Sequence, residues 1–205
     1  MVVADSEVRH NYPDTNRPSG QLEERTDDID SRVWIKFDLS KLSATQIISA
    51  KLYATIDSQY IFGGFQRQLN YHSSLDDTWD EYTITWNNRP DTDPIISDYA
   101  IIPNQNAIQQ YEFDLTLDAR NAIVSDNVFS GEIRYDDERD RWNFNQLYPR
   151  HFELNESWRP YLMVTYETEP HSLEERVSLL EYYINLIVCQ LIPKGLMKDV
   201  TCPIY

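Results

Sequence analysis

Short segments in which apolar and polar residues alternate occupy most of residues 1–168, and no other feature restricts the fold as strongly. In the clearest case, 32–39, every second residue is apolar, and 48–56, 65–73 and 159–167 repeat the pattern. A period of two residues is that of a β-strand with one buried face. About eight to ten short strands, separated by turn residues and without a long helix among them, predict an antiparallel β-sandwich.

Two tryptophans, Trp79 and Trp86, bracket a further alternating run that ends in the turn-forming sequence 87–90. This pattern predicts a strand followed by a turn. Because large aromatic side chains are mostly buried, we expect this stretch to form framework and not a ligand site. The first thirty residues are polar and predict only short edge strands or loops, and 117–124 indicate one or two helical turns.

The charge balance restricts the partners. The chain has 34 acidic and 18 basic residues, a formal net charge of −16. Nucleic acids and anionic membrane surfaces both require a basic face, so the balance argues against these partners. A strongly acidic surface is well hydrated and its repulsion is screened by salt, which fits a halophilic or extracellular protein. Ordinary acidic solubility explains the composition equally well.

Cysteines and the N-terminus give the setting. Cys189 and Cys202 both lie near the C-terminus, so residues 1–168 contain neither a disulfide framework nor a thiolate metal site. The first ten residues lack the basic and long apolar parts of a signal peptide. We therefore expect either a replaced leader or a protein made in a cytoplasm that reaches its place by assembly or lysis.

After Pro170 the pattern changes from strand to helix. Residues 172–175 form a capping box, and Pro193 with Gly195 ends the helix. Twenty residues would span about 30 Å, and their continuous apolar part is too short to cross a membrane. Apolar residues recur at spacings of 4, 3, 4, 3 and 4, the a/d pattern of a coiled coil: Leu173, Val177, Leu180, Ile184, Ile187 and Leu191.

The chain therefore divides into a β-sandwich over 1–168, an oligomerising coiled-coil helix over 169–192 and a docking tail over 193–205. Further apolar residues widen the helical seam, which favours a homotrimer over a dimer. An amphipathic helix that folds back on its own sandwich is the alternative. We expect the tail to bind a capsid or envelope component.

No catalytic constellation is visible. The four histidines are scattered, and with 5 glycines the chain has no phosphate loop or nucleophile elbow. Carboxylate pairs are uninformative among 34 acids. We therefore expect no enzymatic activity and no cofactor. Asp76, Asp77 and Asp80 are candidate ligands for a structural calcium ion, with a solvated acidic loop as the alternative.

Glycan recognition by a sandwich requires exposed flat aromatic rings beside arginine, asparagine or aspartate. Two segments, 65–71 and 134–150, have this composition. Since strand side chains alternate between faces, about half of either set would point into the core. The candidate ligand-binding residues are Arg67, Tyr71, Arg134, Trp142, Tyr148 and Arg150.

Five motifs follow one another in an order that resembles the DNRLRE-type domain of the disaggregatase-related family, to which alginate-type carbohydrate-binding modules are similar. They are 34–40, 48–52, 79–90, 111–116 and 159–166. The resemblance covers roughly Val33 to Glu167. It implies a jelly-roll-like sandwich that is non-catalytic, associated with polysaccharides, and found on microbial surface, secreted and some virion proteins. The string that names the family is absent, and 135–154 follow no family pattern.

We predict a non-enzymatic structural or adhesion protein displayed on an extracellular surface, in the first place a virion decoration, spike or fibre protein. Its sandwich would engage glycans, and its C-terminal helix would trimerise and dock it. The alternative is a polysaccharide-binding module of a cell-surface or secreted protein. A polysaccharide-degrading enzyme is the third hypothesis.

Overall fold

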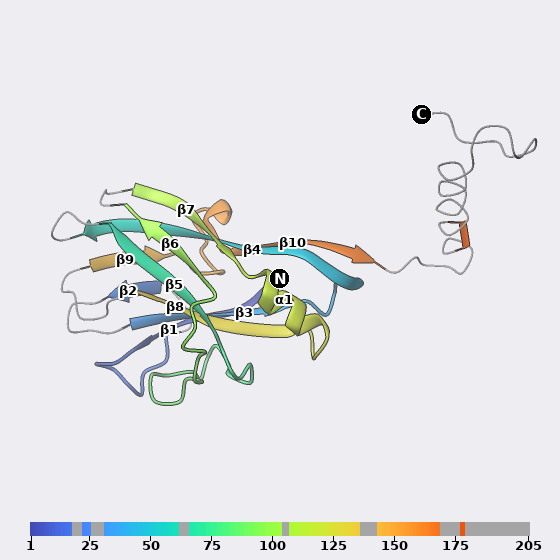
Figure 1. The fold of residues 1–205 in the computed structure, drawn as a ribbon. Coiled ribbons are helices and arrows are strands. Elements are labelled where there is room, and N and C mark those ends of the chain that lie inside the picture. Colours follow the sequence, from blue (N-terminus) through green and yellow to red (C-terminus); the bar gives the residue numbers. More distant parts are fainter. Residues whose placement is uncertain are drawn as a thin grey trace, which may run out of the picture. The chain divides into compact units, whose positions relative to one another are not determined.

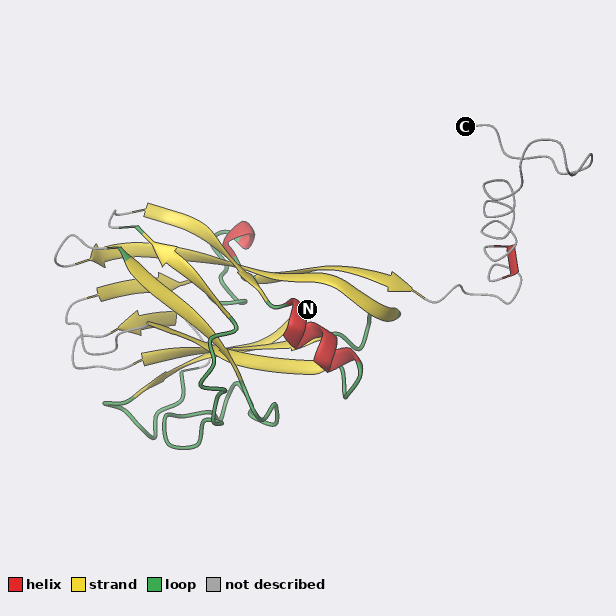
Figure 2. Cartoon of the chain, viewed as in Figure 1, coloured by secondary structure: helices red, strands yellow, loops and turns green. Residues whose placement is uncertain are grey.

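The structure is a computed structural model that describes residues 1–17, 22–25, 31–61, 66–103, 107–135, 143–168 and 177–178. The chain forms two compact units, Met1–Glu167 and Thr168–Tyr205. Among the described residues the first unit has ten strands and two short helices (Figures 1 and 2).

The elements follow one another along the first unit in this order (Figure 1). The strands are β1 (Val2–Arg9), β2 (Leu22–Arg25), β3 (Ser31–Asp38), β4 (Ala44–Ile61), β5 (Arg67–Ser73), β6 (Asp98–Ile102), β7 (Ala107–Asp114), β8 (Val128–Tyr135), β9 (Asn143–Leu147) and β10 (Tyr161–Thr168). The α-helix α1 (Thr116–Ile123) lies between β7 and β8, and the 3-10 helix η1 (Glu156–Trp158) precedes β10.

The strands form two five-stranded sheets that pack face to face. Sheet A has the order β1-β3-β8-β5-β6, and sheet B has the order β10-β4-β9-β2, with β7 also paired to β4. Side chains from both sheets share one hydrophobic core, which includes Ile35 and Phe37 of β3, Leu52 of β4 and Phe113 of β7. Two antiparallel sheets around one core are the sandwich that the alternation predicts.

The predicted alternation is confirmed in the long central strands. In β4, Ala50, Leu52, Ala54 and Ile56 are buried, and in β3 the same holds for every second residue from Val33. The predicted helical turns near residue 117 are confirmed as α1. On β3, however, Trp34 is also fully buried, so the outer face of sheet A must be covered as well.

The Trp79–Pro90 stretch provides this cover, and the prediction of a strand there is wrong. Residues 81–83 and 86–88 form turns, and the Asp80 carbonyl accepts the N–H groups of Thr83 at 3.1 Å and Ile84 at 2.9 Å. The stretch lies over sheet A, where it encloses a second small core: Ala4, Val8, Trp34, Trp79 and Ile84.

Trp79 is framework, as expected. Its side chain is buried, and its indole N–H donates to the Ser130 hydroxyl of β8 at 2.9 Å. The indole of Trp79 also meets Trp34 edge to face, with ring centroids 6.0 Å apart. Packing of aromatic rings against sheet A thus takes the place of strand pairing in this stretch.

The N-terminal strand β1 is longer and more deeply buried than its polar sequence indicates. It is the edge strand of sheet A, and residues 4–9 are buried on both faces. Asp5 pairs with Ile35 and Glu7 pairs with Val33, so both acids lie on the core-facing side of the sheet. Charged side chains at these inward positions break the apolar alternation, which is why the sequence predicted only short edge strands or loops where an edge strand of eight residues forms.

In the second unit, the structure describes Thr168, Val177 and Ser178. Val177, one of the predicted seam residues, is helical and 47% exposed. The other five seam residues and the tail lie outside the described residues, so the coiled coil and the trimer stay predictions. Within the described part of the chain, no helix is long and apolar enough to span a membrane.

Candidate functional site

Four strands of sheet A present one row of polar and aromatic side chains on the outer face. The register pairs Arg134 of β8 with Asn70 of β5, and Asn70 with Tyr99 of β6. The β3–β8 register places Arg32 opposite Arg134. Directly opposed residues of an antiparallel sheet share a face, and the neighbouring positions of these four residues face the core. With about 4.8 Å between strands, the row is roughly 14 Å long.

The two arginines of the row are held by one buried carboxylate, Glu132, which is 0% exposed. Arg32 Nη1 donates to both Glu132 oxygens, at 3.0 and 3.2 Å, and Arg134 Nη1 donates to Oε1 at 2.8 Å. The Thr92 hydroxyl donates to the same oxygen at 3.1 Å. Glu132 thus holds both guanidinium groups through charge-assisted hydrogen bonds.

Aromatic rings lie at both ends of the row. At the β3 end, Trp86 has the guanidinium of Arg89 3.8 Å from its ring centroid and that of Arg32 at 5.0 Å, both within cation–π range. The ring of His10 meets Trp86 edge to face at 5.3 Å. At the β6 end, Tyr99 is 52% exposed. The surface therefore combines two aromatic side chains with two partly exposed arginines, whose side chains are 13% (Arg32) and 22% (Arg134) exposed. Asn70, in contrast, is 4% exposed and accepts a hydrogen bond from Gln68.

His72, which pairs with Glu132 in the register, adds no charge to this surface. Burial lowers the pKa of His72, and the charges of Arg134 and Arg32 act in the same direction. Its Nδ1 lies 3.0 Å from the carbonyl oxygen of Asp93. The imidazole at this position is therefore neutral at neutral pH and adds no charge beside the arginine pair.

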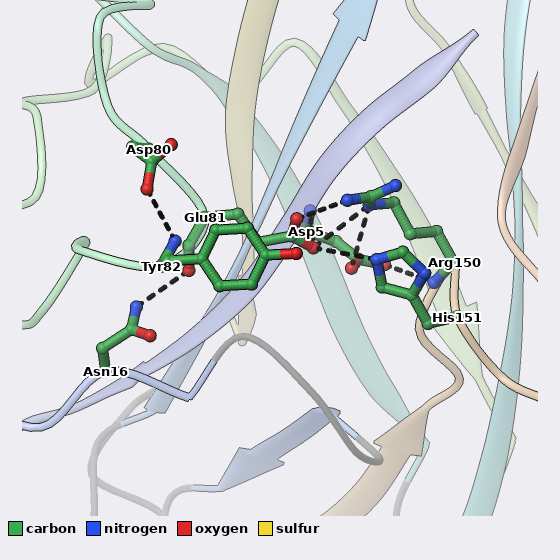
Figure 3. Close-up of polar contacts among 7 residues, drawn as sticks. All are labelled: Asp5, Asn16, Asp80, Glu81, Tyr82, Arg150 and His151. Carbon is green, nitrogen blue, oxygen red and sulfur yellow. Dashed lines mark hydrogen bonds and ion pairs between the residues drawn. The ribbon is translucent and has the colours of Figure 1, made fainter.

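A buried ionic cluster anchors the stretch that carries Trp86 (Figure 3). Glu81 accepts hydrogen bonds from Arg150 Nε at 3.1 Å and from Arg150 Nη2, and His151 Nε2 lies 3.7 Å from the same carboxylate. Asn16 Nδ2 donates to the carbonyl oxygens of Glu81 at 2.9 Å and Ile84 at 2.7 Å. These contacts tie the covering stretch to the N-terminal region and to the loop after β9.

Asp5 of β1 belongs to the same cluster. Its Oδ2 accepts the backbone N–H of Arg150 at 2.6 Å, and its own N–H donates to Glu81 Oε1 at 3.4 Å. Burial, together with the Glu81 charge, raises the pKa of Asp5 to about 7 against the opposing effects of the Arg150 N–H hydrogen bond and the Arg150 charge. Asp5 and Glu81 are both buried, at 0% and 3% exposure, so the cluster has a structural role and is not exposed to a ligand.

The six predicted ligand-binding residues do not form one site. Arg134 lies in the row on sheet A. Arg67 is the first residue of β5 and pairs with the core residue Ile102 of β6, so it lies on the core-facing side of sheet A and not on the side of the row. Arg150 is engaged with Glu81 in the buried cluster. Trp142 lies outside the described residues.

The two predicted tyrosines are framework. Tyr71 is fully buried in the core. Tyr148 is 3% exposed, and its ring packs against Phe152 at 4.5 Å and Trp158 at 4.8 Å. Burial removes both rings from contact with a ligand, because a sugar can stack only on an exposed aromatic face.

Sequence reasoning missed four residues of the surface: Arg32, Asn70, Trp86 and Tyr99. A signal existed for Arg32, which alternates with the inward Val33 and must therefore point outward. Asn70 likewise alternates with Leu69 and Tyr71. Trp86 was assigned to the framework together with Trp79, and Tyr99 lies in a stretch with no clear alternation.

The three calcium candidates are each used within the protein. Asp76 accepts the N–H of Thr78 at 2.7 Å, Asp80 accepts that of Tyr82 at 2.9 Å, and Asp77 accepts the Ser130 hydroxyl at 2.6 Å. Among the residues that the structure describes, no three acidic, histidine or cysteine side chains are placed to share a metal ion.

A two-sheet sandwich with an outer row of aromatic, arginine and amide side chains has the form of a carbohydrate-binding module. The family comparison agrees: the model of carbohydrate-binding module family 96 matches residues 1–166, and the chain belongs to this family. No curated protein matches the chain in sequence. The carbohydrate-binding part of the resemblance is thereby confirmed, whereas the disaggregatase-related label stays a prediction. Such families are binding modules and generally non-catalytic.

Proposed function

We propose that the protein binds an acidic polysaccharide along the outer face of sheet A. The observation that carries this proposal is the pair Arg32 and Arg134, fixed on buried Glu132 and flanked by Trp86 and Tyr99. A row of roughly 14 Å accommodates more than one sugar ring. The exposed ring of Tyr99 offers an apolar face to the ring C–H groups, and Trp86 borders the row with Arg89 and Arg32 against its ring.

The arginine pair sets the class of sugar. Guanidinium groups bind carboxylates through two parallel hydrogen bonds, a geometry that a uronate ring can satisfy. The whole chain carries a net charge of −16, which repels a polyanion at long range. An acidic ligand therefore needs cationic groups at the site itself, and the guanidinium groups of Arg32, Arg134 and Arg89 lie there.

The test is isothermal titration of the full chain with polygalacturonate and alginate, compared with neutral polymers of similar length. Arg134→Ala should weaken binding of the polyuronates about tenfold or more, since a hydrogen bond to a charged group contributes roughly 1.5–3 kcal/mol. Lys41→Ala, in the exposed turn after β3, is the matched control, because it removes one positive charge at the end of that strand opposite to Arg32. Equal affinity of Arg134→Ala and wild type would refute the site.

Ionic strength gives a second measurement. Binding that depends on the arginine pair should weaken between 50 mM and 500 mM salt, because ions screen partly exposed charges. Trp86→Ala should also lower the affinity, with little change in the salt dependence. An affinity that does not depend on salt would contradict an acidic ligand and would indicate a neutral polysaccharide on sheet A.

Family membership favours the second of the two hypotheses from the sequence, a polysaccharide-binding module of a cell-surface or secreted protein, over a virion decoration protein.

We further propose that the C-terminal helix joins such modules into an oligomer and that the tail docks it on a surface component. The a/d spacing from Leu173 to Leu191 supports this. Leu180→Asp with Ile187→Asp should then give monomers in light scattering, and an unchanged mass would rule the seam out.

A further inference from the structure

The outer face of sheet B carries a second group of exposed aromatic and polar side chains, on the opposite side of the sandwich from the arginine row. Tyr53 of β4 and Tyr161 of β10 stack, with ring centroids 5.0 Å apart and an interplanar angle of 18°. The register pairs Tyr53 with Glu112 of β7. The adjacent residues Leu52 and Phe113 face the core, so Tyr53 and Glu112 point outward.

Hydrogen bonds fix the polar groups around the stacked tyrosines. The Tyr53 hydroxyl donates to Glu112 Oε2 at 2.7 Å, and Lys51 Nζ donates to Glu112 Oε1 at 2.5 Å. The Tyr161 hydroxyl donates to Gln110 Oε1 at 3.4 Å. Hydrogen bonds from Lys51 and Tyr53 lower the pKa of Glu112, so the carboxylate is ionised and balances the charge of Lys51.

This surface is accessible and partly preformed. Tyr161 is 41% exposed, and the Lys51 and Glu112 side chains are 38% and 41% exposed. Two residues from Tyr53 on the same face, Thr55 is 3% exposed, and its carbonyl accepts the Tyr148 N–H at 3.2 Å. Because stacking and hydrogen bonds already restrict these side chains, a ligand would remove less conformational entropy on binding.

We infer that Tyr53, Tyr161, Lys51, Glu112 and Gln110 form a second carbohydrate-binding site, which takes uncharged pyranose units. The stacked tyrosines provide an apolar surface for the C–H face of a ring, and the carboxylate, amide and ammonium groups provide acceptors and donors for hydroxyls. Lys51 and Glu112 carry opposite charges and bind each other, so this site has no pair of guanidinium groups like Arg32 and Arg134 for a carboxylate. It therefore favours a neutral sugar where sheet A favours an acidic one.

The inference rests on the proposed function only for the class of ligand, a carbohydrate. Its consequence is that one module has two faces with different sugar preferences. A single copy can then hold two chains at once, or one heteropolymer at two points, and binding at the second point gains from the effective concentration that the first creates.

The test is isothermal titration of the full chain with hexaoses of β-1,4-glucan, β-1,4-mannan and β-1,4-xylan, and with a hexauronate. Tyr161→Ala should weaken binding of at least one neutral hexaose about tenfold and leave the hexauronate affinity unchanged. Arg134→Ala should weaken binding of the hexauronate and leave the affinity for the neutral hexaoses unchanged. Gln110→Ala, which alters an exposed side chain outside the core, should weaken the neutral ligand too, and its thermal unfolding should match wild type.

Two results would overturn the inference. One is that none of the three neutral hexaoses binds. The other is that their binding is lost in Arg134→Ala and kept in Tyr161→Ala and Gln110→Ala, which would place every sugar on sheet A. A different result is that the wild type binds a neutral hexaose but does not bind the hexauronate. This would refute the acidic ligand proposed for sheet A and would not affect the site on sheet B.

Discussion

Asp5→Asn should change how the stability of the protein depends on pH. Asp5 lies buried beside Glu81, and burial raises its pKa to about 7 from the ordinary value of 3.8. Between these two values the folded state keeps a proton on Asp5 and the unfolded chain does not. The free energy of unfolding of the wild type must therefore be highest below about pH 4 as far as Asp5 is concerned, and fall as the pH rises to 7.

The magnitude follows from the size of the shift. Each pKa unit corresponds to about 1.4 kcal/mol, so a shift from 3.8 to about 7 corresponds to a loss of roughly 4 kcal/mol across the window. Asparagine mimics the protonated acid: its oxygen can accept the Arg150 N–H, and its amide can donate to Glu81. We expect Asp5→Asn to match wild type near pH 4 and to be more stable by several kcal/mol at pH 8.

Urea unfolding followed by tryptophan fluorescence, at unit steps from pH 4 to 8, measures this difference. Other acids titrate in both proteins, so the difference between the two curves isolates Asp5. Asp91→Asn, an exposed loop acid, controls for the loss of one negative charge. Parallel stability curves for wild type and Asp5→Asn would refute the reasoning. Burial also raises the pKa values of Asp77 and Asp118, whereas hydrogen bonds lower those of Asp38, Asp76, Glu112 and Asp114, and these six acids titrate alike in both proteins.

Three further changes test the packing of sheet A. Gly131→Ala should lower the free energy of unfolding by about 1–3 kcal/mol, because the new Cβ would lie 2.4 Å from the His72 carbonyl oxygen; a wild-type urea midpoint would contradict this. Trp79→Phe loses the hydrogen bond to Ser130 and should cost about 1–3 kcal/mol, with Trp79→Ala costing more; calorimetry that ranks them otherwise would disprove the role. Glu132→Ala leaves two arginines without their carboxylate and should cost about 3–5 kcal/mol in thermal unfolding, whereas an unchanged Tm would mean that other contacts hold them.

The sandwich could be predicted because its core strands follow the simplest rule. In β3 and β4 every second residue is apolar, and those residues form the shared core. A period of two is a local property of the chain, so it can be read without knowing which strand lies beside which. The register is a different matter. It determined that Arg32, Arg134, Asn70 and Tyr99, from four separate strands, form one row.

The candidate site could be predicted only in part for the same reason. Arg134 and Tyr71 have equally suitable side chains for a sugar, yet one faces solvent and the other is fully buried. Composition identifies residues that could bind a glycan, but exposure depends on the face of the sheet and on what covers that face. The stretch that covers sheet A is Trp79–Pro90. Its alternating sequence predicts a strand, but it forms turns.

The sequence by itself determined the sandwich, its helical turns at α1 and, through its order of motifs, its relation to carbohydrate-binding modules. Each of these depends on residues close in the chain or on their order. Tertiary structure alone decided that Asp5 and Glu81 meet in a buried cluster, that Trp79 is framework while Trp86 borders a surface, and which arginines stand together. Such facts arise from contacts between residues 50 to 150 positions apart, where burial and register, not local pattern, fix the neighbours.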